Sequence, residues 1–209
     1  MITMADAIRP SFARPRTGAH GAAASDAAVP AASLLYELLI VLAGSALIAL
    51  SAWVAIPLPF SPVPVTGQTF AVLLVGSALG ARRGAAAALA YLAEGTWGLP
   101  VFAGGAAGPH VLAGPTGGYL AGFVLGAFAC GALAERGWDR RPLSTVASMA
   151  VGNVAILVPG VVRLAAFVGP GPVWKLGLFP FVPGDLVKIA LAAGLLPLGW
   201  KLLARARPR

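Results

Sequence analysis

Stretches of mostly apolar residues alternate along the chain with polar segments and with segments rich in glycine and proline. A helix that crosses a bilayer needs about 20 mostly apolar residues, and several stretches approach that length. We expect the two short central stretches to form a helical hairpin that turns at Arg82 and Arg83. Pro159 is expected to interrupt the fifth helix. The pattern predicts six transmembrane helices, at residues 34–56, 66–80, 84–97, 117–133, 143–168 and 181–203.

The composition also indicates a membrane protein, because 58% of the residues are hydrophobic and 11% are charged. The mean hydropathy is +0.85. A soluble domain carries roughly a quarter charged residues, so too few charges are present to cover a surface in water. We predict an all-α membrane protein whose single transmembrane domain covers residues 33–205. Residues 1–32 lack the apolar core of a signal peptide and are expected to form a disordered cytoplasmic tail, and residues 206–209 a basic C-terminal tail.

The formal net charge is +8, and the positions of the basic residues decide what that charge means. Twelve of the 15 Lys and Arg residues flank the apolar stretches in four groups, at every second junction: Arg9, Arg14, Arg16, Arg82, Arg83, Arg136, Arg140, Arg141, Lys201, Arg205, Arg207 and Arg209. Basic residues of membrane proteins gather in cytoplasmic loops. The pattern predicts a protein of the cytoplasmic membrane with both termini in the cytoplasm. It does not fit a nucleic-acid partner.

Motifs of common enzymes are absent from the sequence. There is no phosphate-binding loop of the G-x-x-x-x-G-K-S/T type and no His-Glu-x-x-His helix. The single cysteine, Cys130, lies in an apolar stretch, and we interpret it as a small helix residue. We therefore expect no ATP hydrolysis by this chain, no metal site and no cofactor.

The segments at residues 57–64, 98–116 and 169–180 are rich in glycine and proline and would face the outside. The segment at 98–116 has no charged residue and cannot form one continuous helix. Apolar, non-helical backbone at membrane depth is tolerated where it packs on protein or lines a cavity. This segment is therefore predicted to be a lid or a pocket wall.

Charged residues inside transmembrane helices are costly and usually mark functional sites. Asp185 and Lys188 are spaced i, i+3, so they share one face of the sixth helix. Pro183 suits the first turn of that helix, which puts the pair near the outer membrane face. The pair could lock two helices together or line a pocket, and we favour the pocket. Glu37 is expected to reach the membrane interface, whereas Glu94 could anchor there or line the pocket.

Three polar residues within or beside apolar stretches, Gln68, Tyr119 and Asn153, are weaker indications. Asn153 could simply hydrogen-bond between helices. Tyr119 could lie in the aromatic belt at the membrane interface. His110 is assigned no ligand role.

Four stretches of the sequence occur in the order found in one family of vitamin-binding membrane proteins. They read Ser-Pro-Val-Pro-Val-Thr-Gly-Gln-Thr-Phe, Gly-Leu-Pro-Val-Phe-Ala-Gly-Gly, Gly-Pro-Thr-Gly-Gly-Tyr and Pro-Gly-Asp-Leu-Val-Lys, at residues 61–70, 98–105, 114–119 and 183–188. On these stretches the chain resembles the BioY family, the biotin-binding substrate-capture component (S component) of energy-coupling factor (ECF) transporters. The resemblance implies a six-helix bundle with a vitamin pocket near the outer face, closed by outer loops.

Biotin carries a ureido ring with two N–H donors and one carbonyl acceptor, a thioether ring and a carboxylate tail. The resemblance implies that Asp185 accepts a ureido N–H, and that Lys188 donates to the ureido oxygen or pairs with the tail. Tyr119 and Phe102 would form apolar walls, and Gln68 would add a polar contact. The predicted substrate-binding set is Gln68, Phe102, Thr116, Tyr119, Asn153, Asp185 and Lys188.

In the family, a separate transmembrane coupling subunit and two ATPase subunits supply the energy. The resemblance implies the same partners here, with the small residues Ser45, Ala49 and Ala52 of the first helix at the interface with the coupling subunit. Small residues let helices approach closely. Ordinary packing inside the bundle is an equally good explanation, and some family members act without partners.

Three alternatives stay open. The protein could capture another vitamin such as thiamin or riboflavin, although an aromatic content of 8% is low for ligands that stack. It could be a small channel or scaffold without a ligand, which would not need Asp185 and Lys188 on one helix face. It could be an intramembrane enzyme, which would need a catalytic His, Cys or metal cluster inside a span.

Overall fold

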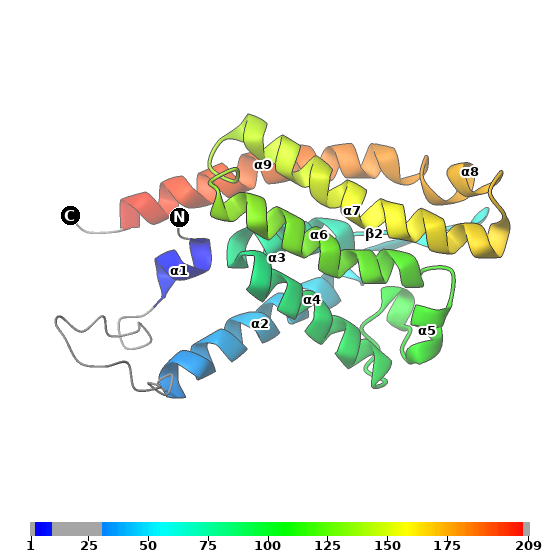
Figure 1. Ribbon diagram of the computed structural model, residues 1–209, viewed down its shortest axis with the longest axis horizontal. Helices are drawn as coiled ribbons and strands as arrows, with labels where there is room; N and C mark the ends of the chain where they lie inside the picture. Colours follow the sequence, from blue (N-terminus) through cyan, green and yellow to red (C-terminus); the bar gives the residue numbers. More distant parts are fainter. Residues whose placement is uncertain (1–2, 10–30, 207–209) are drawn as a thin grey trace, which may run out of the picture.

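The protein is an all-α membrane protein with one small β-hairpin (Figure 1), and its computed structural model describes residues 3–9 and 31–206. Its elements are α1 (Met4–Ile8), α2 (Ala31–Ser51), β1 (Ala55–Leu58), β2 (Ser61–Thr66), α3 (Gln68–Leu79), α4 (Ala81–Thr96), the 3₁₀ turn η2 (Ala103–Gly105), α5 (Pro109–Ala113), α6 (Gly117–Glu135), α7 (Pro142–Val168), α8 (Val173–Gly177) and α9 (Phe181–Ala206). The six predicted helices correspond to α2, α3, α4, α6, α7 and α9. The largest difference is at the first, which ends at Ser51.

Four segments of the described chain are helical, long enough and apolar enough to cross a membrane: Ala31–Ser51, Gly117–Glu135, Pro142–Val168 and Val173–Arg205. The helices α3 and α4 have 12 and 16 residues and are shorter than a full crossing. They form the expected hairpin, since α4 begins one residue after Gly80, the C-cap of α3. The last long helix shows how these segments pack: it buries Asp185, Ala192 and Leu196 and exposes Leu186 and Leu191. One face therefore meets the protein, while an apolar face is left for lipid.

The predicted loop at residues 57–64 is instead part of an antiparallel hairpin. Strands β1 and β2 pair Ala55 with Thr66 and Leu58 with Ser61. Proline donates no ladder hydrogen bond and is therefore rare inside a sheet. Each strand has a single partner, so the prolines fall on edge strands, where they are tolerated.

Pro159 does not interrupt the fifth helix, because α7 is continuous from Pro142 to Val168. The helix α6 packs directly against this turn. A Cβ atom added to Gly118 would lie 2.2 Å from the Pro159 carbonyl oxygen, and one added to Gly122 would lie 2.7 Å from that of Ile156. Neighbouring helices allow proline in a membrane helix, and the glycines of α6 provide that close support.

The two ends of the molecule differ in character. The hairpin, α5 and α8 gather at one end, and α1 and the C-terminal part of α9 lie at the other (Figure 1). Arg82 and Arg83 begin α4 at the end that holds α1, and the segment between α6 and α7 brings Arg136, Arg140 and Arg141 to that end as well. The described basic groups predicted to be cytoplasmic therefore share one end.

Part of the predicted N-terminal tail is folded. Residues 4–8 form α1, which begins with a capping box between Thr3 and Asp6. Residues 10–30 of that tail, including Arg14 and Arg16, and residues 207–209, with Arg207 and Arg209, lie outside the described part of the chain.

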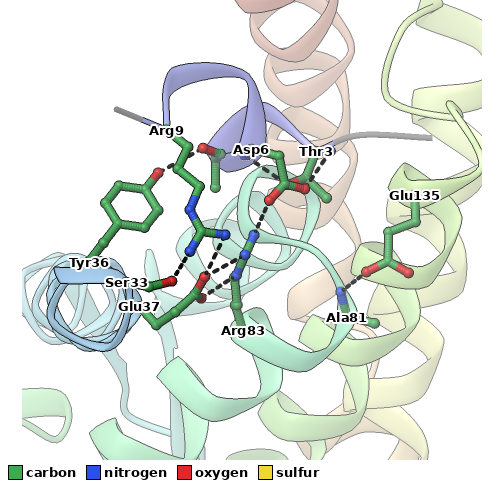
Figure 2. Close-up of polar contacts among 10 residues, drawn as sticks. Thr3, Asp6, Arg9, Ser33, Tyr36, Glu37, Ala81, Arg83 and Glu135 are labelled. Carbon is green, nitrogen blue, oxygen red and sulfur yellow. Dashed lines mark hydrogen bonds and ion pairs between the residues drawn. The ribbon is translucent and has the colours of Figure 1, made fainter. Parts of the chain in front are cut away.

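Charged side chains dock α1 against the bundle (Figure 2). The guanidinium of Arg83 forms two parallel hydrogen bonds to Glu37, of 2.6 and 2.7 Å, and a third of 2.6 Å to Asp6. Arg9 approaches Glu37 at 3.4 Å. The hydroxyl of Tyr36 donates to the Ala5 carbonyl. Glu37, which was expected to reach the membrane interface, joins α2 to α4 and to the N-terminal segment.

Candidate functional site

A cavity of about 250 Å³ lies at the end of the bundle formed by the hairpin, η2, α5 and α8. Strand β2, the starts of α3, α6 and α9, the segment between α4 and α6, and α7 all contribute to its wall. The lining residues are mostly apolar, and the polar ones converge from β2, α3, α9 and the start of α6. The Gly/Pro-rich segment at residues 98–116 contributes Phe102, Ala103, Ala106, Val111 and Thr116, so its predicted place in a pocket wall agrees with the structure.

Asp185 and Lys188 both line this cavity. Asp185 is 6% exposed, and its Oδ1 lies 3.4 Å from the Lys188 ammonium. The ammonium donates shorter hydrogen bonds to the Thr66 carbonyl, at 2.8 Å, and to Thr69 Oγ1, at 2.7 Å. A buried carboxylate needs a partner to remain ionised, and Lys188 supplies it. The two charges cancel, so the cavity offers an acceptor and a donor with no net charge.

Aromatic rings form one wall of the cavity. Phe102 packs edge-on against Tyr91, with ring centroids 5.5 Å apart. Its place depends on Gly95, because a Cβ atom there would lie 2.2 Å from the Phe102 ring. Tyr119 packs against Phe181 at 5.7 Å. Such rings provide flat apolar surface for the ring system of a ligand.

The hydroxyl of Tyr119 donates a 2.7 Å hydrogen bond to the Gly177 carbonyl in α8. Tyr119 is therefore a buried part of the cavity wall, and the alternative of an interfacial belt residue does not hold. Thr116 also lines the cavity, at the start of α6. Gln68, at the start of α3, lines it too and donates from its amide nitrogen to the hydroxyl of Tyr91.

Asn153 is the one residue of the predicted substrate-binding set that does not line the cavity. It lies on the buried face of α7, in a small void bordered by Phe70, Leu73 and Met149. Lys188, which lines the cavity, borders the same void. Asn153 was selected only as a polar residue in an apolar stretch, a signal that does not distinguish a ligand contact from the space between helices.

The predicted partner interface on α2 is only partly at the surface. Ser45 and Ala52 are completely buried within this chain. The hydroxyl of Ser45 donates a 2.7 Å hydrogen bond to Glu94. For these two residues the structure favours the alternative, ordinary packing inside the bundle. Ala49 is half-buried. Glu94, whose role was open, packs against α2 and does not line the cavity.

Three residues that matter for the geometry were missed in the sequence. Thr66 and Thr69 hold the Lys188 ammonium, and Tyr91 contacts both Gln68 and Phe102. The two threonines lie in the stretch at residues 61–70 that carried the family resemblance, so that stretch could have indicated them. Nothing in the pattern around Tyr91 separates it from an ordinary buried tyrosine.

Comparison with known proteins identifies the family. A family model described as the BioY family matches residues 23–205. The chain belongs to the BioY family. The resemblance read from the four sequence stretches is thereby confirmed.

Relatives in this family are named for biotin transport. The biotin transporter BioY of Thermotoga maritima is 43% identical over 71% of this chain and 86% of its own length. The biotin transporter BioY of Rhizobium etli is 39% identical over 70% of this chain and 83% of its own length. Among solved structures, the S component for biotin from an ECF-type ABC transporter has the same fold, with a TM-score of 0.73 and 24% identity. That match covers 83% of this chain and 95% of the solved one.

Proposed function

We propose that this chain is a biotin transporter, the S component of an ECF-type system, and that it binds biotin in the cavity described above. Its relatives over most of their length are biotin transporters, so the chain is a transport protein and not an enzyme. The observation that supports the binding site most strongly is the Asp185–Lys188 pair, held in the wall of a largely apolar cavity.

The ureido group is the part of biotin that fits this pair. It is uncharged and carries both donors and an acceptor, and a neutral ion pair offers the complementary atoms without excess charge. Asp185 accepts one ureido N–H. The apolar rings of biotin then pack between Phe102 and Tyr119.

The geometry around Lys188 favours one of its two predicted roles. An ammonium has three donors, and two of them make short hydrogen bonds to Thr66 and Thr69. The third points to Asp185 across 3.4 Å, which is long for a hydrogen bond. This donor can turn to the ureido oxygen while Asp185 turns to the adjacent N–H. The assignment to the ureido oxygen keeps both charged groups on one part of the ligand.

Titration of biotin into the detergent-purified protein tests the binding site. Asp185→Asn and Lys188→Met are each expected to weaken binding by about 10- to 100-fold, because a hydrogen bond to a charged group is lost. Lys175→Met is the matched control, since Lys175 is exposed on α8 and does not line the cavity. Thiamin and riboflavin serve as competing ligands and are expected not to bind. Unchanged affinity in both cavity variants would reject the assignment.

We also infer six membrane crossings with both termini in the cytoplasm. The short helices α3 and α4 count as crossings in this arrangement, although their lengths are below that of a full span. The support is the alternation of charge, because the basic groups gather at one end of the bundle and the cavity lies at the other. The positive-inside tendency then puts the cavity at the outer face.

A coupling subunit and ATPase subunits are proposed as partners, since this chain has no phosphate-binding loop of its own. Of the three residues predicted for the interface, Ala49 is the one with an accessible side chain. Ala49→Leu is expected to abolish biotin uptake and leave biotin binding unchanged, and Ala190→Leu, on the exposed face of α9, is the control. Normal uptake by the Ala49 variant would remove Ala49 from the interface.

A further inference from the structure

A buried tyrosine behind the cavity, Tyr91, contacts the side-chain amide of Gln68. Tyr91 lies on α4 and is completely buried. Its hydroxyl contacts two groups: the amide nitrogen of Gln68, and the carbonyl oxygen of Val101, to which it donates across 3.2 Å. Gln68 lies before α4 in the sequence and Val101 lies after it, so Tyr91 links these two segments.

These two hydrogen bonds of the Tyr91 hydroxyl can be made with only one arrangement of donors and acceptors. A phenol carries one proton, and a backbone carbonyl can only accept. The Tyr91 proton therefore goes to Val101, and the hydroxyl oxygen is left to accept from Gln68. Only the NH₂ end of the Gln68 side chain can donate. The chemistry thus fixes an amide orientation that would otherwise be ambiguous.

The remaining atom of that amide is the carbonyl oxygen Oε1. Gln68 lines the cavity, and one of the two N–H groups of its nitrogen is directed to Tyr91. Besides the threonine hydroxyls, the cavity wall then includes two acceptors, the Asp185 carboxylate and the Gln68 carbonyl, and a mobile donor, the third N–H of Lys188. Two acceptors and one donor are the complement of a cyclic urea whose two nitrogens are both unsubstituted.

We propose that Tyr91 is a positioning residue, which makes Gln68 an acceptor for the second N–H of a cyclic urea. The proposal rests on the proposed function and goes further, because it explains selection for a ureido group with both N–H donors free. Tyr91 also connects this selection to the segment at residues 98–116, through the Val101 carbonyl and the edge-on contact with Phe102. The residue acts through Gln68 and does not touch the ligand.

A double-mutant cycle tests the proposal. Tyr91→Phe removes one oxygen and keeps the ring that packs on Phe102, and Gln68→Met removes the amide. Each single variant is expected to bind biotin about tenfold more weakly. The double variant is expected to match Gln68→Met, since Tyr91 has no effect once the amide is gone. Tyr36→Phe is the matched control, because its hydroxyl donates to the Ala5 carbonyl away from the cavity.

Ligand analogues provide a readout that a purely structural role would not change. Two biotin isomers, each methylated on a different ureido nitrogen, are titrated into the wild type and into Gln68→Met. One isomer blocks the N–H that meets Gln68, and its disadvantage relative to the other isomer is expected to shrink in Gln68→Met. This comparison does not require the Tyr91 variant, so it tests the acceptor role of Gln68, through which Tyr91 acts, even if Tyr91→Phe does not fold.

Different outcomes test the role of Tyr91 and the proposed function. Losses that simply add in the double variant, or an affinity of Tyr91→Phe equal to that of Tyr36→Phe, would overturn the role of Tyr91. Equal discrimination between the methylated isomers with and without Gln68 would do the same. A wild-type protein that does not bind biotin at all would instead contradict the proposed function.

Discussion

Single residues in the cavity wall are positioned by neighbours that never meet the ligand. Lys188 is aimed by Thr66 and Thr69, and Phe102 occupies space that only a glycine at position 95 leaves open. A core packed to this density transmits small changes of volume to the cavity wall. Residues behind the wall are therefore expected to affect binding as strongly as some of those that line it.

Gly95→Ala tests this effect on binding with a single added methyl group behind the cavity wall. The added methyl group would overlap the Phe102 ring and push it toward the cavity, so both stability and biotin affinity are expected to fall. Overpacking of a core typically costs about 1–3 kcal/mol. Thermal unfolding and biotin titration measure the two effects.

Gly194→Ala is the matched control, because a Cβ atom at position 194 in α9 would meet no atom within 4 Å. That variant is expected to keep its affinity and to be slightly more stable, since alanine favours the helix. Equal stability and equal biotin affinity of the two variants would show that the Phe102 ring does not depend on the space at Gly95.

At the scale of elements, the sequence predicted the six bundle helices and the face of α9 that carries Asp185. Apolar length and the i, i+3 spacing are local signals, and they were sufficient. The hairpin of β1 and β2 was not predicted. Its prolines are tolerated because both strands lie at an edge, and that position is set by the tertiary structure. The same reason explains why Tyr91 was missed and why the surroundings of Asn153 were not predicted: both depend on which helix packs against which.

The N-terminal helix was not predicted either, since its docking depends on charges far apart in the sequence. Arg83→Met is expected to release α1, because Arg83 is bonded to both Asp6 and Glu37. Hydrogen exchange of residues 3–9 should rise strongly, while exchange in α6 and α7 stays unchanged. Arg82→Met is the control, since the neighbouring Arg82 side chain is exposed. Equal protection of α1 in both variants would contradict the assigned role of Arg83.

The docking of α1 is also expected to depend on pH. Burial alone would raise the pKa of Asp6, but hydrogen bonds from Arg83 and Thr3 outweigh it and hold the pKa below the ordinary value of 3.8. A carboxyl group with a lowered pKa stabilises the docked state above its unfolded pKa, and that contribution is lost as the pH falls through the folded pKa. Protection of α1 should therefore persist at neutral pH and disappear below about pH 3.8.

Asp6→Asn checks the origin of that dependence. This variant is expected to dock more weakly at neutral pH. Glu37, Arg9 and Arg83 also face this cluster. A loss of α1 protection in the wild type well above pH 3.8 would contradict the direction of the Asp6 shift.

At the scale of the whole molecule, the two ends of the bundle have opposite roles. One end carries the basic groups and the docked α1, and the other carries the cavity. Single cysteines in a Cys130→Ala background test this sidedness, since Cys130 itself is buried. A membrane-impermeant thiol reagent added to intact cells should label Lys175→Cys, on α8, and spare Lys201→Cys, near the C-terminal end of α9. The reverse labelling pattern would show that the protein has the opposite orientation in the membrane.

The central claim is that the Asp185–Lys188 pair and the aromatic wall hold the ureido ring of biotin. A structure of the biotin complex, resolved well enough to distinguish the ureido ring from the carboxylate tail, tests it most directly. The ureido ring is expected beside Asp185 and Lys188, with its two N–H groups directed to Asp185 and Gln68. Biotin bound outside this cavity, or bound with its carboxylate tail at Lys188, would contradict it.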